Sequence, residues 1–155
     1  MITGSILAKY EAAFAVIPLL VTFIPMLTDT GGNAGSQSST MIIRGMAVGE
    51  IEAGDILRVL WKELRVGIIV GILLGLVNYI QLLIRFPGQE MLCLTVVLSL
   101  LATVVIAKTI GCTLPIIAQI LHLDPAIMAA PLITTIVDAV SLVVYFQLAC
   151  SLLSI

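Results

Sequence analysis

One acidic residue, Asp138, stands in the middle of a long apolar stretch and is the residue best suited to chemistry. A carboxylate deep in a membrane helix is unfavourable by several kcal/mol unless it is paired, hydrated or protonated, so we first expect a functional role. Thr134, Ser141 and Tyr145 fall on the same helical face, and Thr135 flanks that face. Their oxygen atoms suit the binding of a cation or of its water molecules.

Lys108 is a second charge inside an apolar stretch, and it has two interpretations. It is either a structural residue, buried with a partner or extended along an internal face toward water, or a charge that adjusts the field of a pore. The structural interpretation of Asp138 is an ion pair with this lysine. We favour the structural role for Lys108 and the functional role for Asp138.

A polar stripe precedes both residues in the chain. Its members recur at spacings of three and four, which places them on one face of a helix: they are Asp29, Asn33, Ser36, Gln37, Thr40 and Arg44. Polar side chains at membrane depth must face protein or water. Small polar residues also pack helices together, but packing alone does not require Asp, Asn and Gln. The stripe therefore favours a path for an ion.

Three glycines, Gly31, Gly32 and Gly35, stand in the same segment as this stripe. Glycines allow two helices to approach closely, and this explains them without any ligand. A local unwinding of the helix is the other explanation, and it would free backbone carbonyls to face a pore. The sequence leaves both explanations open.

The donor set predicts a hard divalent cation. Carboxylate, amide, hydroxyl and backbone oxygens are available, and these suit Mg²⁺, with Mn²⁺, Ca²⁺ and Co²⁺ as further candidates. Mg²⁺ retains several water molecules, so amides and hydroxyls can bind it through its water shell. One central aspartate gives a single negative charge. A two-fold homodimer would bring two copies of Asp138 together and match the charge of the ion.

The sequence lacks the residue sets that enzymes and structural metal sites need. Its single histidine, His122, falls at a helix boundary, and no P-loop, dinucleotide-binding or His-Glu-x-x-His motif is present. We therefore predict that the chain is not an enzyme. The cysteines are widely spaced without a Cys-x-x-Cys pair, so we expect them to be small buried apolar residues; they are Cys93, Cys112 and Cys150.

The composition predicts the class of fold. Of 155 residues, 61% are hydrophobic and 10% are charged, and the mean hydropathy is +1.24, whereas soluble domains have about 25% charged residues. The net charge of −2 forms no basic run, which excludes nucleic acid as a partner. Four apolar stretches each supply the roughly 20 residues that a membrane-spanning helix needs. We predict an all-α polytopic transmembrane helix bundle that forms a dimeric pore.

The bundle is expected to hold four full spans and the remnant of a first helix. The remnant is Met1–Ala15, which has charges in its middle and too few apolar residues to span a bilayer. We expect the spans at Val16–Ala47, Ile56–Ile84, Met91–Leu121 and Pro125–Leu153, the last with Asp124 as N-cap and Pro125 at the first helical position.

Positive charges near the helix ends predict the orientation in the membrane. One side carries Arg44, Arg58, Lys62 and Arg65, and the other side carries Lys9 and Arg85. The richer side is expected to be cytoplasmic, so the C-terminus lies outside the cell. The predicted location is the cell membrane, with membrane lipid as a partner.

Two sets of motifs resemble the transmembrane helices of the MgtE family of magnesium channels. The runs Pro25–Ser38 and Ile43–Gly45 resemble its second helix. Four further segments resemble the fourth and fifth helices of this family in order and spacing: Gly111–Pro115, Asp124–Ala126, Pro131–Asp138 and Tyr145–Phe146. The resemblance covers nearly the whole chain.

The resemblance implies a homodimer of five-helix subunits with a central pore built by the second and fifth helices. The ion-binding aspartate of the family matches Asp138, its Gly-Gly-Asn segment ends at Asn33, and its Lys-Glu pair ends at Glu63. We expect Glu63 at the cytoplasmic mouth. The expected metal-site residues are Asp138, Asp29, Asn33, Thr134 and, through its carbonyl, Ala130. The expected pore-lining residues are Gly31, Gly32, Ser36, Gln37, Thr135 and Ser141.

Some features of the family are not matched. Some members place an asparagine at the position of Ala130, so only a backbone carbonyl remains there. Family members also carry an N domain, paired CBS domains and a plug helix, whereas we predict residues 1–155 to be a single transmembrane domain. A separate regulatory subunit is a further expected partner.

The predicted function is passive influx of Mg²⁺ through a channel. One alternative is a proton- or sodium-coupled carrier in which Asp138 or Glu63 exchanges the coupling ion for the metal. The other alternative is a non-conducting membrane assembly subunit whose polar stripe packs helices.

Overall fold

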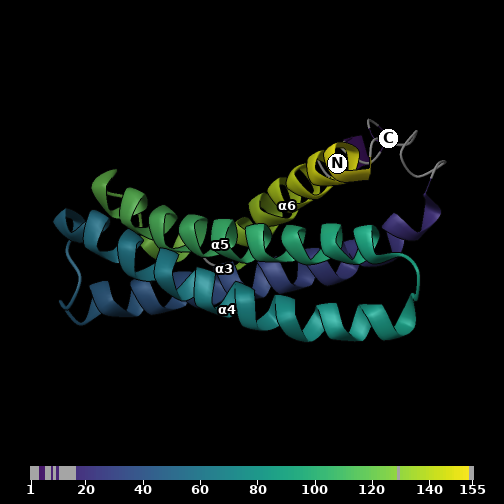
Figure 1. Cartoon of the computed structure of the whole chain (residues 1–155). Helices are drawn as coiled ribbons and strands as arrows, with labels where there is room; N and C mark the ends of the chain where they lie inside the picture. The colour runs from purple at the N-terminus through teal and green to yellow at the C-terminus, as the bar shows by residue number, and fades with distance from the viewer. Residues whose placement is uncertain (1–3, 6–7, 9, 11–16, 129, 154–155) are drawn as a thin grey trace.

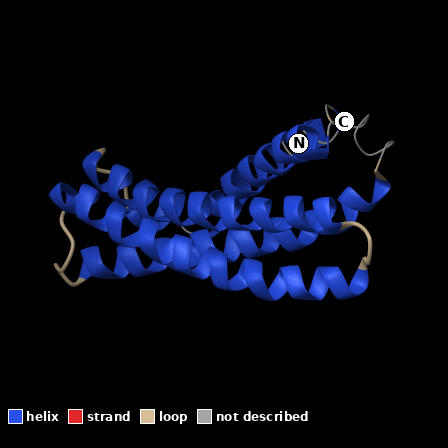
Figure 2. Ribbon diagram, in the orientation of Figure 1, coloured by secondary structure: helices blue, strands red, loops and turns tan. Residues whose placement is uncertain are grey.

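The computed structural model describes residues 4–5, 8, 10, 17–128 and 130–153. Within these residues every regular element is helical, which confirms the predicted all-helical class (Figure 2). The long helices are α3 (Ile24–Ala47), α4 (Ile56–Arg85), α5 (Glu90–Ile120) and α6 (Ala130–Leu153). Short 3-10 helices precede three of them, at Pro18–Phe23, Ala53–Asp55 and Pro125–Met128.

The start of α6 differs from the prediction. Asp124 does not cap α6; its Oδ1 accepts a hydrogen bond from the N–H of Ala126 at 2.9 Å, and Pro125 opens a 3-10 turn. An aspartate that binds the backbone two residues on favours a turn over a helix. The α-helix begins at Ala130, directly before Pro131, because a proline is tolerated only in the first turn.

Three helical segments are long and apolar enough to cross a membrane: α4 with its preceding turn, α5, and α6 from Pro131 onward. The chain is therefore a multi-pass membrane protein. Helix α3 has 24 residues, about 36 Å at the rise of an α-helix, but its polar stripe lowers its hydropathy. The four-span count stays a prediction, and Met1–Ala15 falls mostly outside the described residues.

Helix α5 is the centre of the bundle. It packs against α3, α4 and α6, and α3 also packs against α6 (Figure 1). Tyr145 and Phe146 of α6 are fully buried in the largest apolar cluster. The hydroxyl of Tyr145 donates a hydrogen bond to the carbonyl of Leu20 at 2.9 Å. This bond fixes α6 to the turn that leads into α3.

Glycines set the distances between the helices. A Cβ built on Gly111 of α5 would collide with the carbonyl oxygen of Gly35 on α3 and would lie 3.0 Å from its Cα. The two backbones therefore touch at this point, as small residues permit in membrane bundles. On the other side of α5, Gly67, Gly71 and Gly75 of α4 lie against Val105, Leu101 and Val97.

Because the two backbones touch at Gly111 and Gly35, a methyl group added at Gly111 is expected to have a strong effect on the stability of the fold. Gly111→Ala is expected to force α3 and α5 apart and to destabilise the fold by about 1–3 kcal/mol, the usual range for overpacking. A lower midpoint of thermal unfolding in detergent would show this. Gly54→Ala is the matched control, because a Cβ at Gly54 meets nothing within 4 Å. An unchanged midpoint for Gly111→Ala would contradict the close approach.

Candidate cation site

Helix α3 has two faces of different character. The buried face is made of small and mostly apolar residues that pack against α5 and α6, including Gly31, Gly32, Ala34 and Gly35. The exposed face carries most of the predicted stripe: Asp29, Asn33, Gln37, Thr40 and Arg44. A polar face on a membrane helix needs water or another protein surface. The exposed stripe therefore requires one of these two surroundings in the membrane.

Asp138 lies beside this stripe. A Cβ built on Gly32 would lie 3.2 Å from Cγ2 of Thr134 and 3.9 Å from Oδ1 of Asp138. The missing side chain at Gly32 thus lets α6 approach α3 at the level of Asp138. Asp29 stands three residues before Gly32 on the exposed face of α3, a little less than one helical turn away. Two carboxylates on neighbouring helices create a region that attracts cations.

The glycines of α3 serve packing rather than unwinding. Helix α3 is a continuous α-helix from Ile24 to Ala47, so the alternative that the glycines unwind it is wrong. Gly31 faces Thr103, Val137 and Ser141, each within 3.1 Å of a Cβ built on it. Gly31, Gly32 and Ser141 are buried within the chain.

The remaining predicted residues are on α3 and in the first turns of α6. Ser36 is half-buried, and its hydroxyl has no partner among the described residues. The hydroxyls of Thr134 and Thr135 donate to the carbonyl of Pro131 at 3.1 and 2.8 Å. Thr135 is exposed and Thr134 is half-buried. Ala130 is the first residue of α6, one position before this proline.

The described residues hold no cluster of three or more His, Cys, Asp or Glu side chains that could bind a metal ion. The site offers instead Asp138, Asp29, the amide of Asn33 and nearby hydroxyls. Such a sparse oxygen set suits an ion that keeps much of its water shell, as Mg²⁺ does. A bare ion would need more direct ligands than one chain supplies.

A buried ion pair connects three helices away from this site. Nζ of Lys108 on α5 lies 3.3 Å from Oε2 of Glu63 on α4. Lys108 also donates to the hydroxyl of Ser38 on α3 at 3.1 Å, and that hydroxyl donates to Glu63 at 2.6 Å. The structural role of Lys108 is thus correct, but its partner is Glu63. The alternative that pairs Lys108 with Asp138 is wrong.

The sequence contains a signal for this pair. The contacts Gly75–Val97, Gly71–Leu101 and Gly67–Val105 advance by one helical turn on each helix of the α4–α5 hairpin. The next turn brings Glu63 opposite the residues around Lys108. If the register of the α4–α5 hairpin had been read from the four-residue spacing of these glycines, Glu63 would have been identified as the partner of Lys108.

Glu63 also reaches a cavity. A hollow of about 500 Å³ lies between the end of α3 and the start of α4. Its charged lining residues are Arg44, Glu50, Asp55, Arg58, Lys62 and Glu63. Glu63 thus contacts an accessible space on one side and Lys108 on the other.

Comparison with known proteins identifies the family. The sequence profile of MgtE, described as divalent cation transporters, matches residues 24–148. The chain belongs to the MgtE family. The match covers all four long helices nearly to their ends, including α3 with its polar stripe and α6 with Asp138. The family is one of transporters, in line with the prediction that the chain is not an enzyme.

Two relatives show how far the similarity extends. The magnesium transporter MgtE of Thermus thermophilus is 35% identical over 153 residues, which cover 99% of this chain and 34% of that protein. The magnesium transporter MgtE of Bacillus subtilis is 36% identical over 149 residues, which cover 96% of this chain and 33% of that protein. The chain therefore spans about a third of the length of these MgtE relatives.

Proposed function

We propose that this chain forms a passive Mg²⁺ channel in the cell membrane, with the pore on the axis of a homodimer. The observation that carries the proposal is the position of Asp138, which lies over Gly32 beside the exposed polar face of α3. The names of the related MgtE proteins support Mg²⁺ as the ion. Mn²⁺, Ca²⁺ and Co²⁺ share its preference for oxygen ligands and are the competing ions to test.

A second copy of the chain would solve two problems of the isolated subunit. It would cover the polar face formed by Asp29, Asn33 and Gln37, which lipid cannot solvate. It would also bring a second Asp138 to the axis, so that two negative charges face one divalent ion. A two-fold axis is the commonest symmetry of homo-oligomers.

The hydrated ion is the form that the residues suit. In this proposal Asp138 accepts hydrogen bonds from the water shell of the ion. Asp29, Asn33, Gln37 and Thr134 position the same shell, and the carbonyl of Ala130 adds an acceptor at the mouth of the pore. Gly31, Gly32, Ser36, Thr135 and Ser141 shape the wall behind these residues.

The direction of flow follows from charge and membrane potential. We place the end of the bundle that holds Arg44, Arg58, Lys62 and Arg65 in the cytoplasm, because positive residues concentrate there. The cavity at Glu63 then opens toward the cytoplasm as the inner mouth. A potential that is negative inside draws a divalent ion inward by about 4.6 kcal/mol per 100 mV, twice the value for one charge.

Flux into proteoliposomes tests the proposal. Purified chain is reconstituted in vesicles loaded with a Mg²⁺-sensitive dye, and a negative-inside potential is imposed with K⁺ and valinomycin. We expect Mg²⁺ influx that rises with the potential and does not change when a proton or Na⁺ gradient is imposed. Protein-free vesicles are the control.

Each other outcome favours a different function. Influx that requires a proton or Na⁺ gradient would replace the channel by a coupled carrier. No influx above the protein-free control would favour an assembly subunit whose polar stripe packs against a partner. Influx of Mn²⁺, Ca²⁺ or Co²⁺ in the same assay measures the selectivity.

A further inference from the structure

Helix α4 presents a large surface that the proposed pore does not use. Its main packing partner among the long helices is α5, and most of its apolar side chains are exposed. The largest exposed ones include Ile69, Ile72, Leu73, Leu76, Val77 and Ile80. In the membrane this surface contacts lipid.

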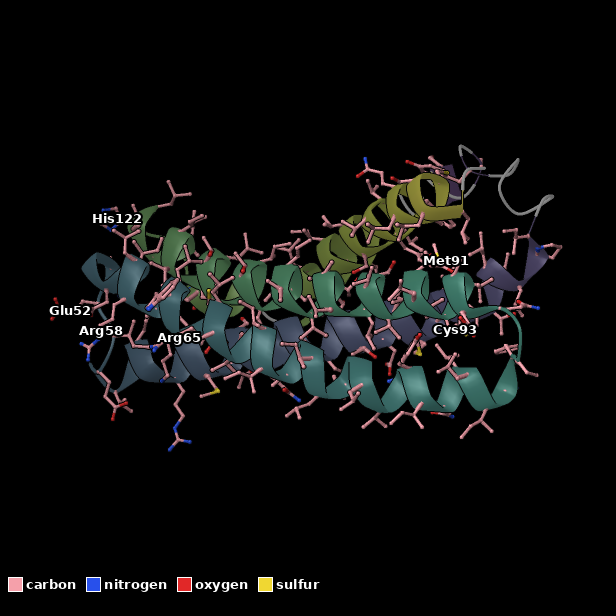
Figure 3. All side chains as sticks on the ribbon, viewed as in Figure 1. Glu52, Arg58, Arg65, Met91, Cys93 and His122 are labelled. Atoms are coloured by element: carbon pink, nitrogen blue, oxygen red, sulfur yellow. The ribbon has the colours of Figure 1, made fainter. Side chains whose placement is uncertain are left out.

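Basic residues gather on the same helix at its N-terminal end. Arg58, Lys62 and Arg65 are exposed, and their spacing of four and three places them on one face. Trp61, 59% exposed, lies beside them. The guanidinium carbon of Arg65 is 5.7 Å from the centroid of the Trp61 ring. Figure 3 shows Arg58 and Arg65 at the end of the bundle opposite Met91 and Cys93.

The position of this group matches the level of the lipid headgroups. The apolar part of α4 that follows, Val66–Ile84, measures about 28 Å at 1.5 Å per residue, close to the roughly 30 Å of a bilayer core. Arg65 therefore lies at the boundary of the hydrocarbon. Trp and basic side chains are typical of this boundary.

An apolar groove lies farther along α4, beginning at Gly71. It has a volume of about 250 Å³, and Gly71, Gly75 and Leu101 line it between α4 and α5. Two other lining residues, Ile72 and Tyr79, follow Arg65 by two and four helical turns and so share its face. Gly71 and Gly75 lie about 9 and 15 Å along the helix from Arg65, within the reach of an acyl chain that spans a leaflet of about 15 Å.

We propose that α4 carries a binding site for one anionic phospholipid. Its phosphate binds Arg58, Lys62 and Arg65 beside Trp61, and one acyl chain lies in the groove at Gly71 and Gly75.

The charge of the ligand follows from the neighbouring residues. Glu63 points inward to Lys108, and the Asp55 side chain accepts a hydrogen bond from the N–H of Glu52. Glu50 and Asp55 line the cavity between α3 and α4, and Arg58 and Lys62 line it as well. Because Glu63 is paired with Lys108 and Asp55 is bonded to the backbone, Arg58, Lys62 and Arg65 outnumber Glu50, the remaining acidic residue of the cavity lining, so an anionic headgroup is favoured over a zwitterionic one.

Trp61 allows a direct test, because it is the single tryptophan of the chain. The protein is placed in mixed micelles with phosphatidylglycerol or phosphatidylcholine, each brominated near the headgroup end of its chains, without divalent ions. We expect half-maximal quenching of Trp61 at about tenfold less phosphatidylglycerol than phosphatidylcholine, since each basic residue adds to the attraction. The triple variant Arg58→Gln, Lys62→Gln, Arg65→Gln should lose this preference. Arg85→Gln at the other end of α4 should keep it.

A second reporter tests the groove. In the variant Trp61→Phe, Leu76→Trp the tryptophan lies at the rim of the groove, and the lipids are brominated in the middle of their chains. The same tenfold preference is expected, because one molecule occupies both positions.

Three results would overturn the proposal. Equal quenching of Trp61 by the two lipids would remove the anionic site. Loss of the preference on addition of inorganic phosphate at constant ionic strength would assign the basic group to a soluble anion. A groove reporter without preference would separate the headgroup site from the groove. None of these measurements involves ion flux, so their outcome is independent of the channel proposal.

Discussion

Asp138→Asn is expected to reduce Mg²⁺ flux by at least about a hundredfold, which corresponds to about 3 kcal/mol. A carboxylate and a divalent ion about 5 Å apart, with one water between them, attract each other by about 7 kcal/mol at an effective dielectric constant of about 20. The amide of asparagine keeps the size of the side chain and removes the charge. Most of the attraction is therefore lost without a cavity being created.

The measurement is Mg²⁺ influx into proteoliposomes under an imposed potential. Asp124→Asn is the matched control, since it makes the same chemical change in an exposed turn outside the proposed pore. Its amide oxygen can still accept the hydrogen bond from the N–H of Ala126. We expect that variant to conduct like the original protein. Equal flux in Asp138→Asn and Asp124→Asn would remove Asp138 from the ion path.

The second large effect is expected at the buried ion pair. The side chains of Lys108 and Glu63 are 7% and 5% exposed, so Lys108→Met leaves the Glu63 carboxylate buried with only the Ser38 hydroxyl as partner. Loss of one member of a buried pair destabilises a protein by about 3–5 kcal/mol. Lys108→Met is thus expected to lower the midpoint of thermal unfolding in detergent strongly.

The double variant Lys108→Met, Glu63→Gln separates the pair from the packing of Lys108. It removes both charges, and we expect it to recover most of the stability lost in Lys108→Met, because neutral replacements of a buried pair are often tolerated. Lys62→Met, at an exposed neighbouring position, is the control and should change the midpoint little. If the double variant is as unstable as the single one, the stabilisation comes from packing and not from charge.

The buried pair also limits how Glu63 can act at the proposed inner mouth. Its carboxylate contacts the cavity between α3 and α4 but is already bound by Lys108 and Ser38. A carboxylate whose charge is offset by a neighbouring lysine attracts a divalent ion less strongly than an unpaired carboxylate does. Asp138 has no such partner among the described side chains, so we expect it to bind the ion more strongly than Glu63 does.

Much of the architecture could be predicted because its signals are local. The predicted bounds of α4 and α5 agree with the structure to within one residue at each end, since long apolar stretches that end at charged or turn residues mark membrane helices. The exposed face of α3 followed from the spacing of Asp29, Asn33 and Gln37 along one helix. Asp138 was identified from its isolation in an apolar stretch.

Other features depended on contacts between distant parts of the chain. The partner of Lys108 is Glu63 and not Asp138, because the register of the α4–α5 hairpin decides which side chains meet. Gly31 and Gly35 could have unwound α3 or packed it, and the close approach of α5 and α6 decided for packing. Ser141 shares a helical face with Asp138 but is buried against Gly31.

The sequence by itself thus determined the helices, their polar faces and the isolated carboxylate, since hydropathy and helical periodicity are properties of single segments. The tertiary structure decided which residues pair, which are buried and which remain on the exposed face. These outcomes depend on how closely the glycines let one helix approach another, and that distance is a property of two helices together.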